Sequence, residues 1–148
     1  REGVDAGVLS ESQVTLLDRA MAMQDLNVTG EMVPWTDVRT LAADLRGDVR
    51  LDALEGHNYT RRPVLEHDGR VIGVVSVLDI LLDPDQSTRR LMTAPLFMAA
   101  TTSVPEALEL LRTAGQTIAI VNDAGNRPVG IVTMKDLVEV LTGELEAW

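Results

Sequence analysis

The sequence predicts an α/β (α+β) fold in which two β-α-β-β-α units are related by a pseudo-twofold axis and follow an N-terminal amphipathic helix. The main observation is an internal repeat, because residues 73–79 (Gly-Val-Val-Ser-Val-Leu-Asp) reappear 57 positions later at residues 130–136 (Gly-Ile-Val-Thr-Met-Lys-Asp). Apolar residues follow strand and helix periods in turn within each copy. A unit of this size with three short strands cannot bury both faces of its sheet alone, whereas two units packed face to face can.

The second copy shows its elements most clearly. Val104, Ala107 and Leu111 recur at helical spacing, and the apolar run from Ile118 to Val121 is typical of a buried strand. The turn between its two strands is dense in Asn, Asp and Gly, which tolerate positive φ. The predicted elements are a short extended segment at 96–99, a helix at 104–114, strands at 118–121 and 129–132 around a turn at 122–126, and a closing helix at 134–141.

The first copy follows the same order with weaker signals. His67, Asp68 and Gly69 predict the matching hairpin turn. We align the run from Pro63 to Glu66 with the run from Ile118 to Val121. The other predicted elements of this copy are strands at 64–65 and 71–75, a short helix near 48–54, and an opening segment at 31–34 that matches 91–95. The predicted division is a linker helix at 1–30, a first domain at 31–88, and a second domain with a C-terminal extension at 89–148.

Residues 1–30 lie outside the repeat. Ser10 and Gln13 have the spacing of a capping box, in which each side chain accepts a hydrogen bond from the backbone N–H of the other. Val14, Leu17 and Met21 then form one apolar stripe, which predicts an amphipathic helix over residues 11–24. The chain begins without a methionine, so we expect it to be a piece of a longer protein.

The composition excludes several classes of protein. Of 148 residues, 45% are apolar and only 3% are aromatic, so the core must be aliphatic. The net charge of −10 argues against a nucleic-acid partner, because phosphate contacts need clustered Lys and Arg. The absence of cysteine excludes disulfides and cysteine zinc sites, and the isolated His57 and His67 predict no metal site. No nucleophile, base and acid are spaced as a catalytic set, so we expect that the chain is not an enzyme.

The repeated Gly-x-x-Ser/Thr-x-x-Asp element is the main candidate for a functional site. In each copy a predicted strand ends at the hydroxyl residue and a helix begins, at Ser76 with Asp79 and at Thr133 with Asp136. One interpretation is structural, because this spacing also makes a capping box. The other is nucleotide binding, since helix N–H groups attract phosphate and a nearby carboxylate accepts hydrogen bonds from ribose hydroxyls. Duplication at a fixed offset favours nucleotide binding. Arg61 has two similar alternatives, as a phosphate-binding residue or a surface arginine.

The doubled motif on β-α-β-β-α units resembles the CBS (cystathionine β-synthase) domain pair, or Bateman module, over residues 31–142. It is most similar to the CorC/CNNM-type magnesium and cobalt transport proteins. Residues 32–38 (Met-Val-Pro-Trp-Thr-Asp-Val) are similar to that family's opening motif, and residues 59–64 (Tyr-Thr-Arg-Arg-Pro-Val) to its Tyr/His-Ser-Arg-x-Pro-Val stretch. Trp35 and Arg62 depart from the pattern, because those positions are usually an arginine and an apolar residue.

The resemblance implies a site for an adenine nucleotide, ATP or AMP, with Mg²⁺ usually bound beside ATP in that family. The residues it implies are Thr36, Tyr59 and Ile131 around adenine, Thr133 and Asp136 at ribose and phosphate, and Thr60 and Arg61 at the phosphates. Ser76 and Asp79 form a second candidate site. The resemblance also implies a homodimer, located on the cytoplasmic face of the membrane beside the membrane-spanning domain of the parent protein.

We therefore expect a regulatory, nucleotide-binding CBS pair from the cytosolic region of a CorC/CNNM-type magnesium or cobalt transporter. One alternative is a CBS pair that regulates a soluble enzyme or a channel. Another is a dimerisation module without a ligand. The flanking sequence of the parent would decide the first alternative, and binding of ATP, AMP or S-adenosylmethionine would decide the second.

Overall fold

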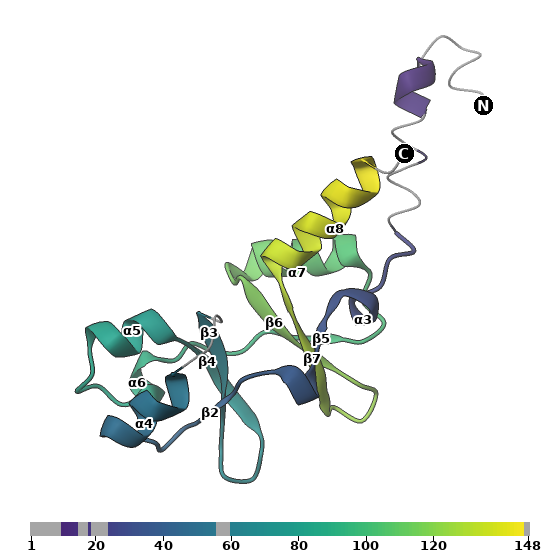
Figure 1. The fold of residues 1–148 in the computed structure, drawn as a ribbon. Coiled ribbons are helices and arrows are strands. Elements are labelled where there is room, and N and C mark those ends of the chain that lie inside the picture. Colours follow the sequence, from purple (N-terminus) through teal and green to yellow (C-terminus); the bar gives the residue numbers. More distant parts are fainter. Residues whose placement is uncertain (1–9, 15–17, 19–23, 56–59, 147–148) are drawn as a thin grey trace.

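The computed structural model describes residues 10–14, 18, 24–55 and 60–146. Short helices and strands alternate along this part of the chain (Figure 1). In order they are α3 (Val28–Glu31), β1 (Val33–Pro34), the 3-10 helix η1 (Trp35–Asp37), β2 (Leu41–Ala42), α4 (Gly47–Leu54), β3 (Arg61–Leu65), β4 (Val71–Ser76), α5 (Val77–Leu82), α6 (Thr88–Leu91), β5 (Phe97–Ala99), α7 (Val104–Ala114), β6 (Ile118–Asn122), β7 (Pro128–Thr133) and α8 (Met134–Glu146).

The predicted β-α-β-β-α order is confirmed in both copies, as β2-α4-β3-β4-α5 and as β5-α7-β6-β7-α8. Helix α7 has the predicted bounds because its signals are complete. Ser103 caps it by accepting a hydrogen bond from the N–H of Glu106 at 3.2 Å. Gly115 ends it in the left-handed region at φ 65°, where glycine has no steric penalty. Helix α8 continues to Glu146, past the predicted end, and α3, η1, β2 and α6 were not predicted.

The two hairpins have the same register, which confirms the 57-residue repeat. Arg61 pairs with Ser76 in the first unit, and Ile118 pairs with Thr133 at the equivalent place in the second. Both ladders also shift register at equivalent points, at Val64/Leu65 and Val121/Asn122. The sequence alignment of Pro63 with Ile118 is therefore wrong by two residues. Turns of equal length set the register, whereas the alignment matched only the apolar runs.

The opening segments of the two units are exchanged. Strand β1 precedes the first unit but pairs with β7 of the second, joining Val33 to Ile131. Conversely, Thr93 precedes the second unit but forms a bridge with Val74 of the first. The resulting sheets have the orders β1-β7-β6-β5 and β2-β3-β4. Packing thus crosses the domain boundary near residue 88, which remains a prediction from the sequence.

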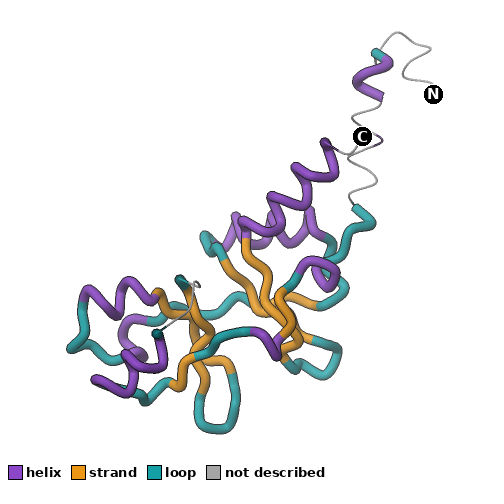
Figure 2. Tube along the Cα trace, viewed as in Figure 1, coloured by secondary structure: helices purple, strands orange, loops and turns teal. Residues whose placement is uncertain are grey.

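The two sheets lie between two groups of helices, with α4, α5 and α6 beside one sheet and α7 and α8 beside the other (Figures 1 and 2). Each unit has its own aliphatic core between sheet and helices, and a third apolar cluster joins the units. That cluster combines Val74 of β4 with Ile118, Ile120 and Ile131 of the other sheet. We call the sheet surfaces that meet at this cluster the inter-unit face.

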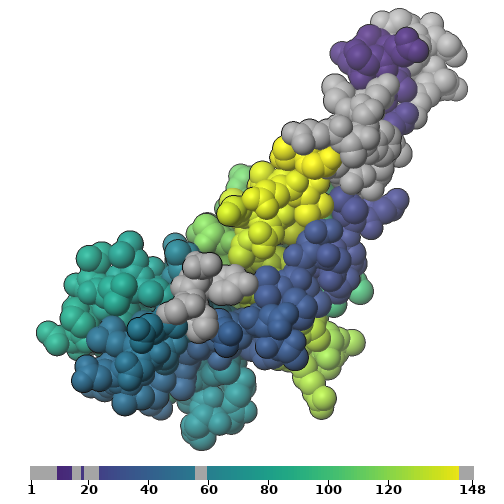
Figure 3. Space-filling view, viewed as in Figure 1, coloured from purple at the N-terminus to yellow at the C-terminus, as the bar shows by residue number. Residues whose placement is uncertain are grey.

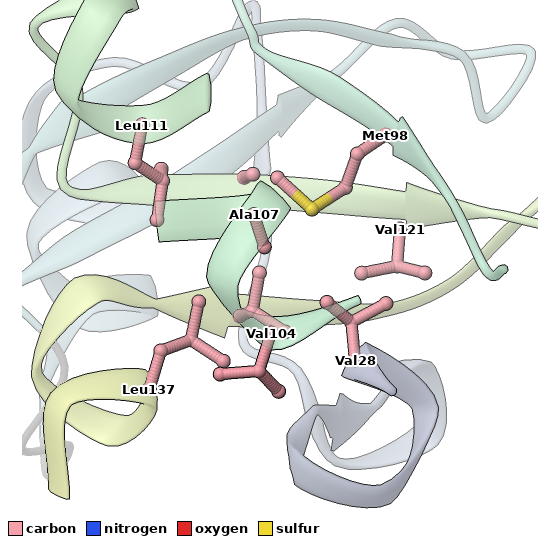
Figure 4. Close-up of a cluster of buried hydrophobic side chains, with 9 residues drawn as sticks. Val28, Met98, Val104, Ala107, Leu111, Val121 and Leu137 are labelled. Carbon is pink, nitrogen blue, oxygen red and sulfur yellow. The ribbon is translucent and has the colours of Figure 1, made fainter. Parts of the chain in front are cut away.

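The core of the second unit is the larger of the two single-unit cores (Figure 4). Val104, Ala107 and Leu111 of α7 are fully buried there, as their spacing predicts. Leu137 of α8 and Val28 of the exchanged helix α3 are equally buried in the same cluster. An element that precedes the first unit therefore completes the core of the second.

The capping box that begins the N-terminal helix is confirmed. The N–H of Ser10 donates to Oε1 of Gln13 at 2.7 Å, and the N–H of Gln13 donates to Oγ of Ser10 at 3.2 Å. Residues 11–14 are helical, whereas most of the remaining residues of the predicted helix lie outside those described. Within the described part of the chain, every helix is too short or too polar to cross a membrane.

Candidate functional site

Strand alternation places four of the predicted site residues on the inter-unit face. Ile131 belongs to the cluster that joins the units, while its neighbour Val132 is buried against the helices. Successive side chains of a strand point to opposite faces, so Thr133 lies on the same face as Ile131. The same argument from Val74 and Val75 places Ser76 there. Arg61, the cross-strand partner of Ser76, shares that face.

Thr36 reaches the second unit through the exchange of opening segments. It lies in η1, which follows β1 and contacts β7. The side chain is exposed, whereas the neighbouring Trp35 packs against the apolar cluster of the inter-unit face. The structure thus brings Thr36 to the strand that contains Ile131 and Thr133, although it is distant from both in sequence. Tyr59, the other predicted adenine contact, lies outside the described residues.

The Thr133–Asp136 pair makes only half of a capping box. The N–H of Asp136 donates to Oγ1 of Thr133 at 3.1 Å. No described residue donates a hydrogen bond to the Asp136 carboxylate, in contrast to the reciprocal pair at Ser10 and Gln13. Both Thr133 and Asp136 are half-buried at the start of α8. The carboxylate therefore retains its hydrogen-bonding capacity for a ligand at a helix N-terminus.

The equivalent pair in the first unit is built differently. Ser76 is the N-cap residue of α5, but its side chain makes no capping hydrogen bond. Asp79 is exposed, and α5 has only six residues. The capping interpretation therefore fails at Ser76 and is half satisfied at Thr133. The two copies of the motif are equivalent in sequence position but not in their hydrogen bonds.

The residues that precede β3 and β6 each accept a backbone hydrogen bond from the first residue of the helix that follows the hairpin. The N–H of Val77 donates to the carbonyl of Thr60 at 2.7 Å, and the N–H of Met134 donates to the carbonyl of Thr117 at 2.8 Å. The backbone of Thr60 is thereby fixed beside the start of α5. The side chains of Thr60 and Arg61 are exposed, and Arg61 has no hydrogen bond or ion pair with a described residue.

Two buried arginines were missed as structural residues by the sequence analysis. Arg62 is 1% exposed and donates to the carbonyl oxygens of Ala53 at 2.7 Å and Leu54 at 3.1 Å, at the end of α4. Burial lowers the pKa of Arg62, and the positive charge of Arg39 lowers it further. Arg50 is 2% exposed and donates to two carbonyls between α5 and α6 and to the hydroxyl of Thr88 at the start of α6. The only sequence signal for Arg62 was that an arginine occupies a position where the CorC/CNNM-type pattern usually has an apolar residue.

The described residues offer no group of three or more His, Cys, Asp or Glu side chains that could hold a metal ion. A shallow apolar groove of about 320 Å³ lies between α4 and α5. Leu51, Leu54, Val77 and Leu81 line it together with two acidic residues. It contains none of the predicted nucleotide contacts, so it is a separate surface from the candidate site.

Comparison with known proteins agrees with this architecture. The CBS domain family profile matches residues 48–83 and 89–143, more than half of the chain. The polyamine export protein of Haemophilus influenzae is 26% identical over 150 residues, which cover 97% of this chain and 35% of that protein. The chain spans 33% to 54% of the lengths of several curated relatives that it matches.

Two solved structures illustrate the similarity of the fold. The CBS domain of a bacterial CNNM/CorC family Mg²⁺ transporter in complex with ATP has a TM-score of 0.77 and 21% identity, covering 86% of this chain and 94% of that one. A CBS-domain pair with bound AMP from Klebsiella pneumoniae has a TM-score of 0.70 and 17% identity, covering 80% and 100%. The predicted fold and the predicted resemblance are confirmed, and the chain belongs to the CBS domain family as a tandem pair.

Proposed function

We propose that this CBS pair binds an adenine nucleotide at the inter-unit face, beside the start of α8, and that it regulates the protein of which it is a part. The observation that supports this most directly is that only one of the two hydrogen bonds of the capping box at Thr133 and Asp136 is formed. Asp136 is half-buried at a helix N-terminus and has no described hydrogen-bond donor at its carboxylate. Ribose hydroxyls would supply such donors, and the free N–H groups of the first turn would attract phosphate.

Each predicted contact has a defined chemical role in this proposal. Ile131, which is 3% exposed at the inter-unit face, would border the adenine ring together with Thr36 and Tyr59. Asp136 accepts from the ribose hydroxyls, and Thr133 lies between ribose and phosphate. Arg61 is exposed and unpaired among the described residues, so it is available to the outer phosphates beside Thr60. Ser76 and Asp79 form the weaker second site, because the short α5 has no side-chain cap.

The negative net charge of the chain makes positive groups beside the phosphates important for nucleotide binding. The chain has a net charge of −10, which opposes the approach of a polyanion such as ATP. Arg61 and the helix N-terminus offset this repulsion locally, and Mg²⁺ bound to the phosphates would reduce it further. The expected ligand is therefore ATP with Mg²⁺, or AMP, whose smaller charge meets less repulsion.

The second proposed partner is another copy of the chain. Helix α5 of the first unit exposes Leu82 at 74%, Leu78 at 59% and Leu81 at 54%. Val138 of α8, 57 positions after Leu81, is also exposed. Equivalent helices of both units therefore present apolar side chains to solvent, and a homodimer would bury them.

The parent protein is proposed to be a CorC/CNNM-type magnesium or cobalt transporter, with this pair on the cytoplasmic face of the membrane. The similar ATP-bound domain comes from a transporter of that family. The pair would have no catalytic site, and nucleotide binding would favour one arrangement of the parent over another. A CBS pair in a soluble enzyme or a channel remains the alternative parent.

A thermal-shift screen with ATP, AMP and S-adenosylmethionine tests the proposed ligand. At a concentration about 100-fold above Kd, a nucleotide would add about 2.7 kcal/mol to the free energy of unfolding and raise Tm by about 5–10 °C. Tripolyphosphate serves as the control for binding of phosphate alone. A shift only with S-adenosylmethionine would change the ligand class. No shift with any compound would support the dimerisation module without a ligand.

A further inference from the structure

Two buried arginines distinguish the core of the first unit from the core of the second. The 57-residue offset of the repeat aligns Arg50 with Ala107 and Arg62 with Ala119, and all four residues are buried. Neither arginine forms an ion pair with a carboxylate among the residues that the structure describes. Burial of a charge costs free energy unless hydrogen bonds offset it. Each guanidinium must therefore be stabilised by the neutral acceptors that surround it.

Arg62 takes the place of a backbone cap at the end of α4. Helices α4 and α7 begin at equivalent positions, but α4 has 8 residues and α7 has 11. In α7 the carbonyl of Leu111 accepts a hydrogen bond from the N–H of Gln116 at 3.0 Å. The equivalent carbonyl in α4 belongs to Leu54 and accepts from the guanidinium of Arg62 at 3.1 Å, and the carbonyl of Ala53 accepts from the same group at 2.7 Å. Arg62 thus satisfies the last carbonyls of a shortened helix and places a positive charge at the negative end of its dipole.

The early end of α4 lengthens the connection to β3. Residues 55–60 join α4 to β3, whereas only residues 115–117 join α7 to β6. The Arg62 side chain reaches back to the carbonyl of Leu54, so it closes a loop that contains residues 55–61. Within that loop, the carbonyl of Thr60 accepts the N–H of Val77 at 2.7 Å. The two residues proposed to contact the phosphates, Thr60 and Arg61, therefore lie between two fixed points.

Arg61 and Arg62 point to opposite faces of the first sheet. Arg62 pairs with Val75, which belongs to the core beneath the helices, whereas Arg61 pairs with Ser76 on the inter-unit face. Helices α4 (blue) and α5 (teal) form the outer surface of this unit in Figure 3. Because Arg62 is buried on the helix side of the sheet, a nucleotide at the inter-unit face does not touch it. An effect of Arg62 on binding must pass through its neighbours in the chain.

We infer that Arg62 is a positioning residue for the phosphates of the nucleotide, because its cap on α4 closes the loop 55–61 and sets the position of Arg61. This inference rests on the proposed function. A guanidinium with two acceptors fixes the loop before the ligand arrives, which lowers the entropic cost of the contact between Arg61 and phosphate. The second unit has Ile118 and Ala119 at the equivalent positions, so it lacks both parts of this arrangement.

Arg62→Met tests the inference, because methionine fills much of the buried volume but donates no hydrogen bond. Calorimetric titration of the full chain with ATP and with adenosine gives the two affinities. We expect Kd for ATP to rise about three- to tenfold, as when one more side chain must be ordered on binding, and Kd for adenosine to change by less than about twofold. Arg50→Met is the matched control, since Arg50 is equally buried in the same unit but donates to the carbonyls of Pro84 and Gln86. It should leave both affinities within about twofold of the wild-type values.

A double variant tests whether Arg62 acts through Arg61. In an Arg61→Ala background, Arg62→Met should cause no further loss of ATP affinity. If methionine prevents folding, Arg62→Lys takes its place, because lysine keeps the charge but offers one nitrogen to two carbonyls, and it should still raise Kd for ATP. Unchanged ATP affinity, an equal loss for ATP and adenosine, or the same loss in Arg50→Met would refute the positioning role and leave the proposed function intact. Absence of ATP binding to the wild-type chain would instead refute the proposed function, and the inference with it.

Discussion

The substitution Asp136→Asn separates nucleotide binding from helix capping. In the structure, Asp136 contributes its backbone N–H to Oγ1 of Thr133, and asparagine retains that hydrogen bond. The substitution removes the negative charge of a carboxylate at a helix N-terminus, so the free energy of unfolding should fall by only about 0.3–1 kcal/mol. If the carboxylate accepts hydrogen bonds from ribose, its replacement should cost about 1.5–3 kcal/mol of binding free energy. ATP affinity should therefore fall about tenfold to a hundredfold.

The measurements are urea denaturation for stability and calorimetric titration with ATP and adenosine for affinity. Adenosine should lose affinity by a similar factor, because it keeps the ribose hydroxyls. Thr133→Val is the reciprocal variant, since it removes the capping oxygen and should lower stability by about 1 kcal/mol. Asp79→Asn is the positional control, and it should change ATP affinity less than Asp136→Asn. Equal ATP affinity for the wild-type protein and Asp136→Asn would refute the assignment of Asp136.

Three further outcomes are expected. Arg62→Ala should lower the free energy of unfolding by about 2–5 kcal/mol in urea denaturation, because it removes the donor from the buried carbonyl of Leu54 and the partly buried carbonyl of Ala53 and creates a cavity; a loss below about 0.5 kcal/mol would contradict this. The pKa of Asp68 lies below its ordinary value, chiefly because the backbone N–H of Arg70 donates to it. Its stabilising contribution is thus present above the unfolded-state pKa and lost as pH falls through the folded-state pKa. Arg70→Ala retains that N–H, so an NMR titration should still find a lowered pKa; a return to about 3.9 would show that the side chain dominates. Leu81→Glu should shift light scattering from dimer toward monomer, and an unchanged dimer would place the interface elsewhere.

The sequence predicts the repeated units well because their signals are local. Helix α7 has its cap, its apolar spacing and its terminal glycine within one short segment, and its bounds are predicted correctly. The turns at 67–69 and 122–126 define the two hairpins for the same reason. In the structure the two hairpins close over turns of equal length, from Glu66 to Arg70 and from Asp123 to Arg127, and this gives an identical register in both units. The Gly-x-x-Ser/Thr-x-x-Asp repeat also identifies the start of α8 as the candidate site before any contact is known.

The two copies of that motif are nevertheless indistinguishable as capping residues in the sequence. Only the structure shows that Thr133 caps its helix while Ser76 does not, and that the Asp136 carboxylate is left without a described donor. Hydrogen bonds of this kind depend on backbone angles at the strand end, which the residue types alone do not determine. The same holds for Arg62, whose burial depends on two carbonyls at the end of a helix that lies earlier in the chain.

The sequence by itself determined the fold class, the two β-α-β-β-α units and their 57-residue offset, because periodicity, caps and turns act over a few residues. The tertiary structure alone decided which sheet receives each opening segment. Strand β1 has only two residues, too few to encode a partner, and its place depends on the space above Gly130 and the fit of Val28 into a distant core. Those contacts join residues 74 to 98 positions apart, and their free energy appears only when the second unit is folded.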